Sequence, residues 1–255
     1  MSEYIKSDTA DGILTLTISR PEKKNALTVA MYAALADSIS QADDDESVRV
    51  ILITGSEDSF TAGNDFKDFL DNPPVDPSSP VFRFMNAIAG AQKPVVAAVN
   101  GLAIGIGTTM LLHCDLVYAV DTARFQMPFV NLGLVPELGS SLVLPALAGR
   151  ARAAELLMCG DPFSAETAKE FGLINGISSA DELMNTAQIL AKKLAAKPPA
   201  ALRKTKALLN MDVDDVRARI DREAKVFSEQ LSSAEVKEAI AAFLEKRAPD
   251  FSKFE

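Results

Sequence analysis

Residues 93–107 read KPVVAAVNGLAIGIG, and this stretch decides the fold class. Its first part, Pro94–Val99, is an almost wholly apolar run of the length expected for a strand buried on both faces. A glycine-studded turn and a helix over 100–112 are predicted to follow it. A buried strand that leads into a helix is the unit from which parallel α/β sheets are built.

The same order of elements extends outward from this stretch in both directions. Strands are predicted over 12–19 and 48–54 on one side and over 115–120 on the other. Between them, apolar residues recur every four positions from Leu27 to Ile39, which predicts an amphipathic helix, and a short helix is expected around 81–91. The segment 55–80 is rich in loop residues. The alternation of strands and helices predicts an α/β fold.

Beyond about residue 140 the patterns become helical. The predicted helices span 149–158, 164–171, 181–197, 199–210, 214–231 and 232–247. The last of them begins with Ser232-Ser-Ala-Glu235, which is a capping-box pattern. We therefore divide the chain near 195, into an α/β core over 1–195 and a C-terminal helical region over 196–255.

Composition limits the possible functions. The chain has 255 residues and a net charge of −9, so it lacks the basic character that binding to nucleic acid or an anionic membrane needs. The N-terminus is polar and no apolar run is long enough to span a membrane, so no membrane partner and a cytoplasmic location are expected. The two cysteines, Cys114 and Cys159, form no metal-ligand pair, and we expect a reducing compartment and no metal site.

Two patterns resemble catalytic or cofactor motifs and fail on inspection. His113, Cys114 and Asp115 are consecutive, so on a helix their side chains diverge by roughly 100° and cannot meet at one atom. The pair Gly105 and Gly107 lacks the third glycine of a dinucleotide fingerprint, because Met110 stands at its place. The pair then predicts a tight turn into a helix, where backbone N–H groups can meet a ligand.

Glu137 lies among apolar neighbours in the stretch 134–140, LVPELGS. If it is buried, its pKa should be raised, which suits a group that takes up and returns a proton. The same residue fits a solvent-facing glutamate after a proline, and its local sequence does not separate the two readings.

Six stretches taken together and in order resemble the crotonase (enoyl-CoA hydratase/isomerase) superfamily, from about residue 10 to the end of the chain. They are Asn25–Leu27, Thr61–Asp65, Lys93–Gly101, Gly105–Gly107, Cys114-Asp115 and Phe243–Arg247. The resemblance implies a crotonase-like superhelix of repeated β-β-α turns and a C-terminal helical region that packs a homotrimer or a dimer of trimers. It also implies an acyl-CoA thioester as substrate, with coenzyme A entering as part of that substrate and no separate cofactor.

The resemblance assigns roles to particular residues. The backbone N–H groups of Asn64 and Ile106 would form an oxyanion hole for the thioester oxygen. The two glutamates of the hydratases would fall at Thr109 and Phe129, so hydration lacks both its acid and its base. Glu137 matches the lone glutamate of the peroxisomal-type Δ3,Δ2-enoyl-CoA isomerases, which implies a 1,3-proton shift from a 3-enoyl-CoA to a 2-trans-enoyl-CoA.

Contacts to the substrate follow from the same resemblance. The residues expected near it are Lys23, Asn25, Ala26, Leu27, Ala62, Gly63, Asp65, Phe66, Gly105, Thr109 and Phe129, with Phe243 and Lys246 from a neighbouring subunit. The loop 66–84 is expected to build much of the acyl pocket. Two other functions stay open: ring-opening isomerisation of an aromatic-derived epoxy-CoA, and binding of acyl-CoA without catalysis.

Overall fold

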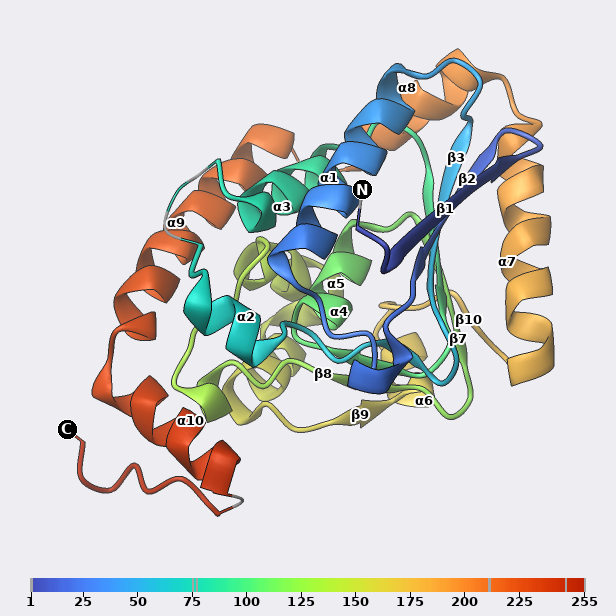
Figure 1. The fold of residues 1–255 in the computed structure, drawn as a ribbon. Coiled ribbons are helices and arrows are strands. Elements are labelled where there is room, and N and C mark those ends of the chain that lie inside the picture. Colours follow the sequence, from blue (N-terminus) through green and yellow to red (C-terminus); the bar gives the residue numbers. More distant parts are fainter. Residues whose placement is uncertain (1, 75, 77, 211, 246, 255) are drawn as a thin grey trace.

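The structure is a computed structural model that describes residues 2–74, 76, 78–210, 212–245 and 247–254. Its strands form a larger sheet in the order β1-β2-β3-β5-β7-β10 and a smaller one in the order β4-β6-β8-β9 (Figure 1). Neighbours are parallel except for β1 with β2 and β8 with β9. The strands are β1 (Ile5–Ala10), β2 (Ile13–Ile18), β3 (Val50–Gly55), β4 (Ser59–Thr61), β5 (Val95–Val99), β6 (Leu102–Ile104), β7 (Leu116–Val120), β8 (Arg124–Gln126), β9 (Phe163–Ser164) and β10 (Gly176–Ser178).

Helices cover both faces of the larger sheet, which confirms the α/β prediction. In Figure 1, α7 runs along one side of this sheet, while α1, α3, α4 and α5 lie on the other. The α-helices are α1 (Val29–Asp44), α2 (Phe66–Asp71), α3 (Pro80–Gly90), α4 (Ile106–Thr109), α5 (Ser140–Ala154), α6 (Ala165–Glu170), α7 (Ala180–Ala195), α8 (Pro199–Leu209), α9 (Val213–Leu231) and α10 (Ala234–Glu245). Shorter segments are η1 (Pro21–Lys23), η2 (Met110–His113), η3 (Val130–Leu132) and a π-helical turn, η4 (Glu155–Cys159). None of the helices in the described ranges is long and apolar enough to cross a membrane.

A β-β-α unit repeats along the first half of the chain. The strand pairs β3–β4, β5–β6 and β7–β8 each place one strand in the larger sheet and the next in the smaller, and helical segments follow each pair. Because β4 and β6 are parallel neighbours, the turns that follow them lie side by side at the same sheet edge. The repeat thereby brings together two loops that are distant in sequence.

The core follows from the apolar patterns. Every residue of β5 is fully buried, as expected for a central strand covered on both faces. On α1 the apolar stripe Met31, Leu35 and Ile39 is at most 1% exposed. The central strands and α1 therefore form where the sequence predicted them, with shifts of one or two residues at their ends.

Several local predictions were wrong. β1 was not predicted, because it is an edge strand with mostly exposed polar residues; the Asp11-Gly12 hairpin turn was its signal. The segment predicted as loop over 55–80 contains β4 and α2. The helix predicted from Gly149 begins at Ser140, and Gly149 has a non-helical backbone inside it. The cap of α10 is Ser233, whose hydroxyl accepts from the Val236 N–H, and not Ser232.

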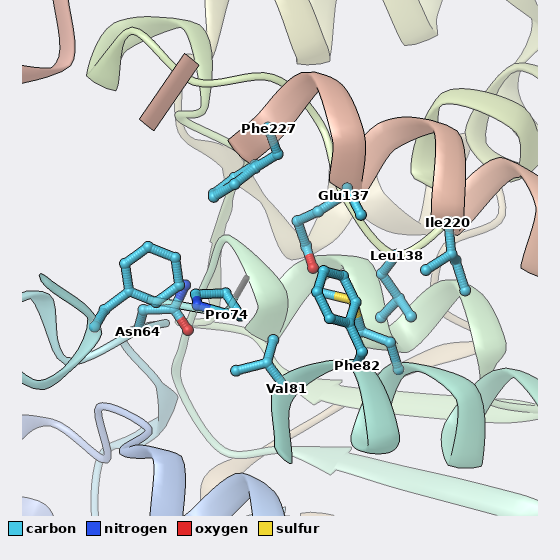
Figure 2. A pocket seen from close by; sticks show the side chains of 11 residues that line it. Asn64, Pro74, Val81, Phe82, Glu137, Leu138, Ile220 and Phe227 are labelled. Atoms are coloured by element: carbon cyan, nitrogen blue, oxygen red, sulfur yellow. The ribbon is translucent and has the colours of Figure 1, made fainter. Parts of the chain in front are cut away.

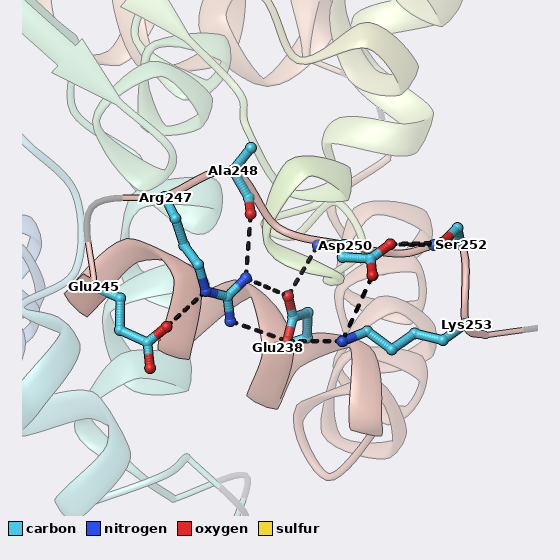
Figure 3. A network of polar contacts seen from close by, with 7 residues as sticks. All are labelled: Glu238, Glu245, Arg247, Ala248, Asp250, Ser252 and Lys253. Carbon is cyan, nitrogen blue, oxygen red and sulfur yellow. Dashed lines mark hydrogen bonds and ion pairs between the residues drawn. The ribbon is translucent and has the colours of Figure 1, made fainter.

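A polar network fixes the C-terminal tail against α10 (Figure 3). The Arg247 guanidinium forms ion pairs with Glu238 and Glu245, at 2.6 Å each, and donates to the Ala248 carbonyl. Glu238 also accepts from the Asp250 N–H at 2.9 Å. The hydrogen bonds from Arg247 and the Asp250 N–H lower the pKa of Glu238 to about 2, so its carboxylate keeps these partners across the neutral range.

Candidate active site

Two turns meet where β4 and β6 end. Gly63 follows β4 with φ +88°, and a Cβ atom there would lie 2.9 Å from the Ile104 carbonyl oxygen. Gly105 follows β6 with φ +56°. Both backbones adopt conformations that residues with a Cβ rarely take, so glycine allows the turns to approach each other and to place Asn64 and Ile106 beyond them.

Asn64 and Ile106 carry the two backbone N–H groups that the family resemblance assigned to an oxyanion hole. Leu27 bonds the residues on either side of Asn64, accepting from Asp65 at 2.9 Å and donating to Gly63 at 2.7 Å, so the amide of Asn64 itself faces away from Leu27. Ile106 is the first residue of α4, where N–H groups have no partner inside the helix. Neither N–H has a hydrogen-bond partner among the residues that the structure describes.

Glu137 lies between η3 and α5 and is 8% exposed. Its Oε1 accepts a hydrogen bond of 2.5 Å from the Thr109 hydroxyl, and its buried Oε2 has no partner within the described chain. Burial raises the pKa of Glu137 to about 8; the Thr109 hydrogen bond lowers it, and the charge of Glu223 raises it further. Of the two interpretations that the sequence left open, the structure favours the buried acid.

The turn that carries Glu137 is held from several sides. Its carbonyl accepts from the Ser140 hydroxyl at 2.6 Å, and the next carbonyl, of Leu138, accepts from His113 Nε2 at 2.8 Å. Burial lowers the pKa of His113 to about 4, so the ring is neutral near pH 7. His113 therefore has the structural role that the sequence indicated.

A mostly apolar cavity adjoins Glu137 (Figure 2), with about 370 Å³ of free space including its open mouth. Its walls come from the loop after β4, from α2, α3 and α9, and from the Glu137 turn. The lining residues are Asn64, Phe69, Pro74, Val81, Phe82, Met85, Glu137, Leu138, Ile220, Ala224 and Phe227. The segment 66–84, which was expected to be a loop and contains α2 and the start of α3, contributes to the wall. The cavity has the composition of a site for an apolar group.

Sequence reasoning missed the wall contributed by α9. Ile220, Ala224 and Phe227 recur at helical spacing, and the Phe227 ring meets Phe69 edge-on at 6.0 Å. This spacing was the available signal, but it resembles the pattern of any helix with one buried face. Tyr32 on α1 was also missed; its hydroxyl donates to the Asn64 side-chain oxygen, and burial raises its pKa, with a further contribution from the Glu137 charge.

The remaining predicted contact residues fall into two groups. Some hold the loops: Asn25 is fully buried and donates to the Ser59 carbonyl at 2.6 Å, and Asp65 caps α2 and pairs with Arg20 at 2.7 Å. The others bond through their backbones: the Ala62 N–H donates to the Lys24 carbonyl at 2.9 Å, and the Ala26 N–H donates to the Lys23 carbonyl at 3.0 Å. Leu27 is buried, whereas Lys23 and Phe66 are exposed.

The last three predicted contact residues are Phe129, Phe243 and Lys246. Phe129 is 6% exposed and does not line the cavity. Lys246 and the side chain of Phe243 lie outside the described residues. The described residues contain no cluster of side chains suited to hold a metal ion.

Comparisons with known proteins agree with this architecture. The profile of the enoyl-CoA hydratase/isomerase family matches residues 8–253. The 1,2-epoxyphenylacetyl-CoA isomerase of Escherichia coli is 38% identical, with 99% of each chain covered, and the 2,3-dehydroadipyl-CoA hydratase of the same organism is 32% identical, with 98% of this chain and 99% of the hydratase covered. The crystal structure of an enoyl-CoA hydratase/isomerase from Pseudoalteromonas atlantica has a TM-score of 0.94 and 43% identity over 98% of this chain and 100% of the other. The chain therefore belongs to the enoyl-CoA hydratase/isomerase family, the crotonase superfamily, whose members are enzymes that act on acyl-CoA thioesters.

Proposed function

We propose that this enzyme is a Δ3,Δ2-enoyl-CoA isomerase, which moves the double bond of a 3-enoyl-CoA to give 2-trans-enoyl-CoA. One observation carries the proposal: the carboxyl of Glu137 is buried against an apolar cavity, its pKa is near 8, and one of its oxygens has no partner among the described residues. The two positions of the hydratase glutamates hold Thr109 and Phe129. A proton shift needs one group that acts as base and then as acid, whereas hydration needs two.

The reaction balances with Glu137 alone. The carboxylate takes a proton from C2, and the electrons of that C–H bond form a dienolate whose charge spreads over C2, C4 and the thioester oxygen. The carboxylic acid then returns the proton to C4, the double bond lies between C2 and C3, and the carboxylate is regenerated. The N–H groups of Asn64 and Ile106, which have no partner among the described residues, would hold the charged oxygen; one donor of this kind contributes ~3–4 kcal/mol.

The surroundings of Glu137 suit this role. Thr109 holds Oε1, which leaves Oε2 to carry the proton between the two carbons. The apolar lining lowers the water content beside the dienolate and limits its protonation by solvent. A pKa near 8 keeps the carboxyl close to the balance between base and acid at neutral pH.

A second candidate is ring-opening isomerisation of an aromatic-derived epoxy-CoA. Two observations favour it. The E. coli relative at 38% identity is a 1,2-epoxyphenylacetyl-CoA isomerase. Three aromatic rings, Phe69, Phe82 and Phe227, line the cavity, where a ring-bearing acyl group would find stacking partners. Glu137 and the two backbone amides would serve this chemistry as well.

The deciding experiment offers both substrates to the parent and to Glu137→Gln, which keeps the shape and removes the base. We expect trans-3-hexenoyl-CoA to yield 2-hexenoyl-CoA, seen as growth of the conjugated thioester absorbance, with at least a ~100-fold loss in the variant. Glu229→Gln, an exposed change of the same chemistry on α9, should match the parent. Turnover of 1,2-epoxyphenylacetyl-CoA alone would favour the second candidate. Binding of CoA esters without either reaction would favour a non-catalytic acyl-CoA binder.

The assembly, location and cofactor follow as further parts of the proposal. We propose a homotrimer or a dimer of trimers in the cytoplasm that needs no cofactor beyond the coenzyme A of its substrate. On α8, Leu208 and Leu209 are 87% and 80% exposed, an apolar surface that a neighbouring subunit would cover. Light scattering should give three or six times the protomer mass of 27.3 kDa, and a monomer would contradict this.

A further inference from the structure

The turn after Glu137 has an unusual backbone. Leu138 and Gly139 follow Glu137 directly, and both have positive φ angles, of 56° and 69°. A leucine seldom adopts this conformation, because its Cβ crowds the following carbonyl, so neighbouring groups must hold it. The pair of left-handed residues sets where the Glu137 side chain leaves the backbone and where α5 begins.

A buried glutamate on α9 holds this turn from the other side. One carboxylate oxygen of Glu223 accepts from the Gly139 N–H at 2.7 Å, and the other accepts from the Ser141 N–H at 2.9 Å and the Ser141 hydroxyl at 2.5 Å. Glu223 is only 6% exposed. A Cβ atom on Gly139 would lie 3.3 Å from the side chain of Val216, which is on α9 like Glu223. Helix α9 therefore packs directly on the turn.

We propose that Glu223 is a positioning residue: its carboxylate holds the turn from Glu137 to Ser141 in the left-handed conformation that aims Glu137 at the cavity. The three bonds join at one carboxylate, so the bonding geometry suits the ionised form. The same helix lines the cavity with Ile220, Ala224 and Phe227, and α9 therefore fixes the acid and the acyl wall together. This inference rests on the role proposed for Glu137.

Glu223 also acts on Glu137 through its charge. A buried negative charge nearby disfavours ionisation of Glu137 and raises its pKa. Among the described residues, the titratable and charged groups beside Glu137 and Glu223 are Tyr32 on α1, His113 on η2 and Arg219 on α9. Arg219 donates to the Ser141 hydroxyl at 3.2 Å and partly offsets the charge of Glu223. Removing the Glu223 charge should therefore lower the pKa of Glu137.

The test compares Glu223→Gln with Glu229→Gln, its matched control on the exposed face of α9. In the glutamine, an NH2 group takes the place of the carboxylate oxygen that accepts from the Gly139 N–H. Two donors then face each other, so this hydrogen bond is lost. We expect kcat to fall by about 10- to 100-fold with KM unchanged, because a small misplacement of a reacting group costs that much. The midpoint of the acid limb of the kcat profile should move to lower pH. Glu223→Asp, which keeps the charge, should lower kcat while leaving that midpoint near the parent's.

A second variant and a readout without substrate keep the test decisive. If Glu223→Gln does not fold, as judged by circular dichroism and thermal unfolding, Ser141→Ala is the second variant. It removes the hydroxyl that donates to Glu223 and accepts from Arg219, and it should lower kcat by about 3- to 10-fold. Carbon-13 NMR titration of the Glu137 carboxyl, assigned with Glu137→Gln, should show a lower midpoint in Glu223→Gln even if the parent turns over neither substrate. The proposal would be overturned if Glu223→Gln folds and keeps both the parent's kcat and the parent's pKa at Glu137. If Glu223→Gln does not fold, a Ser141→Ala variant with the parent's kcat would overturn it.

Discussion

Replacing Glu137 by glutamine should stabilise the folded protein, and the gain should grow with pH. The folded-state pKa of Glu137 is about 8, whereas the ordinary value is 4.5. Between these two values the unfolded chain has already released the proton while the folded chain still holds it. The folded state binds more protons in this window, so its stability falls as pH rises from 4.5 to 8. A glutamine has no charge and escapes this loss.

The magnitude follows from the two pKa values. Their difference corresponds to at most about 5 kcal/mol above pH 8, at about 1.36 kcal/mol per pKa unit. The glutamine can keep the bond from Thr109 to Oε1, but its N–H group takes the place of the unpartnered Oε2, which costs about 1–3 kcal/mol. We therefore expect a net gain of about 2–4 kcal/mol at pH 9, together with loss of catalysis.

Urea unfolding at pH 5, 7 and 9, with the protomer concentration fixed, would measure the effect. The difference between Glu137→Gln and the parent should be small or negative at pH 5 and rise toward pH 9. Glu229→Gln, an exposed substitution, should show no such trend. A difference that stays constant with pH, or that falls as pH rises, would refute the argument that burial raises the pKa of Glu137.

Three further predictions concern the supports of the site. Thr109→Val removes the hydrogen bond that lowers the pKa of Glu137, so the acid limb of the kcat profile should move to higher pH and kcat should fall ~10-fold; an unmoved limb would contradict this. Gly63→Ala places a Cβ atom 2.9 Å from the carbonyl at the end of β6, and kcat should fall about 100-fold with a loss of ~1–3 kcal/mol in urea unfolding; parent-like kinetics would argue against an oxyanion hole here. Lys206→Met leaves the Asp115 carboxylate without its 2.7 Å ion pair and should cost about 3 kcal/mol in the same assay, with kcat unchanged in the fraction that stays folded; an unchanged midpoint would show that the pair is dispensable.

Much of the fold could be predicted from local patterns. The apolar run of β5 and the stripe on α1 indicate burial by their own periodicity, and the structure confirms both. The edge strand β1 was not predicted, because its residues are mostly polar, face solvent and show little alternation of apolar and polar side chains. The start of α5 at Ser140 was not predicted, because no local signal marks it. The group that accepts from the Gly139 N–H at this helix end is Glu223, 84 residues farther along the chain. The division of the chain near residue 195 stays a prediction.

For the site, the sequence by itself determined which chemical groups are present. Glycines at 63 and 105 permit the two turns, and the family resemblance implies that Thr109 and Phe129 stand where hydration would need carboxylates. Only the tertiary structure decided that Glu137 is buried, that its pKa is raised, and that α9 forms the wall beside it. The physical reason is that conformational preferences act between near neighbours in the chain, whereas burial and charge interactions depend on every segment that packs around a group.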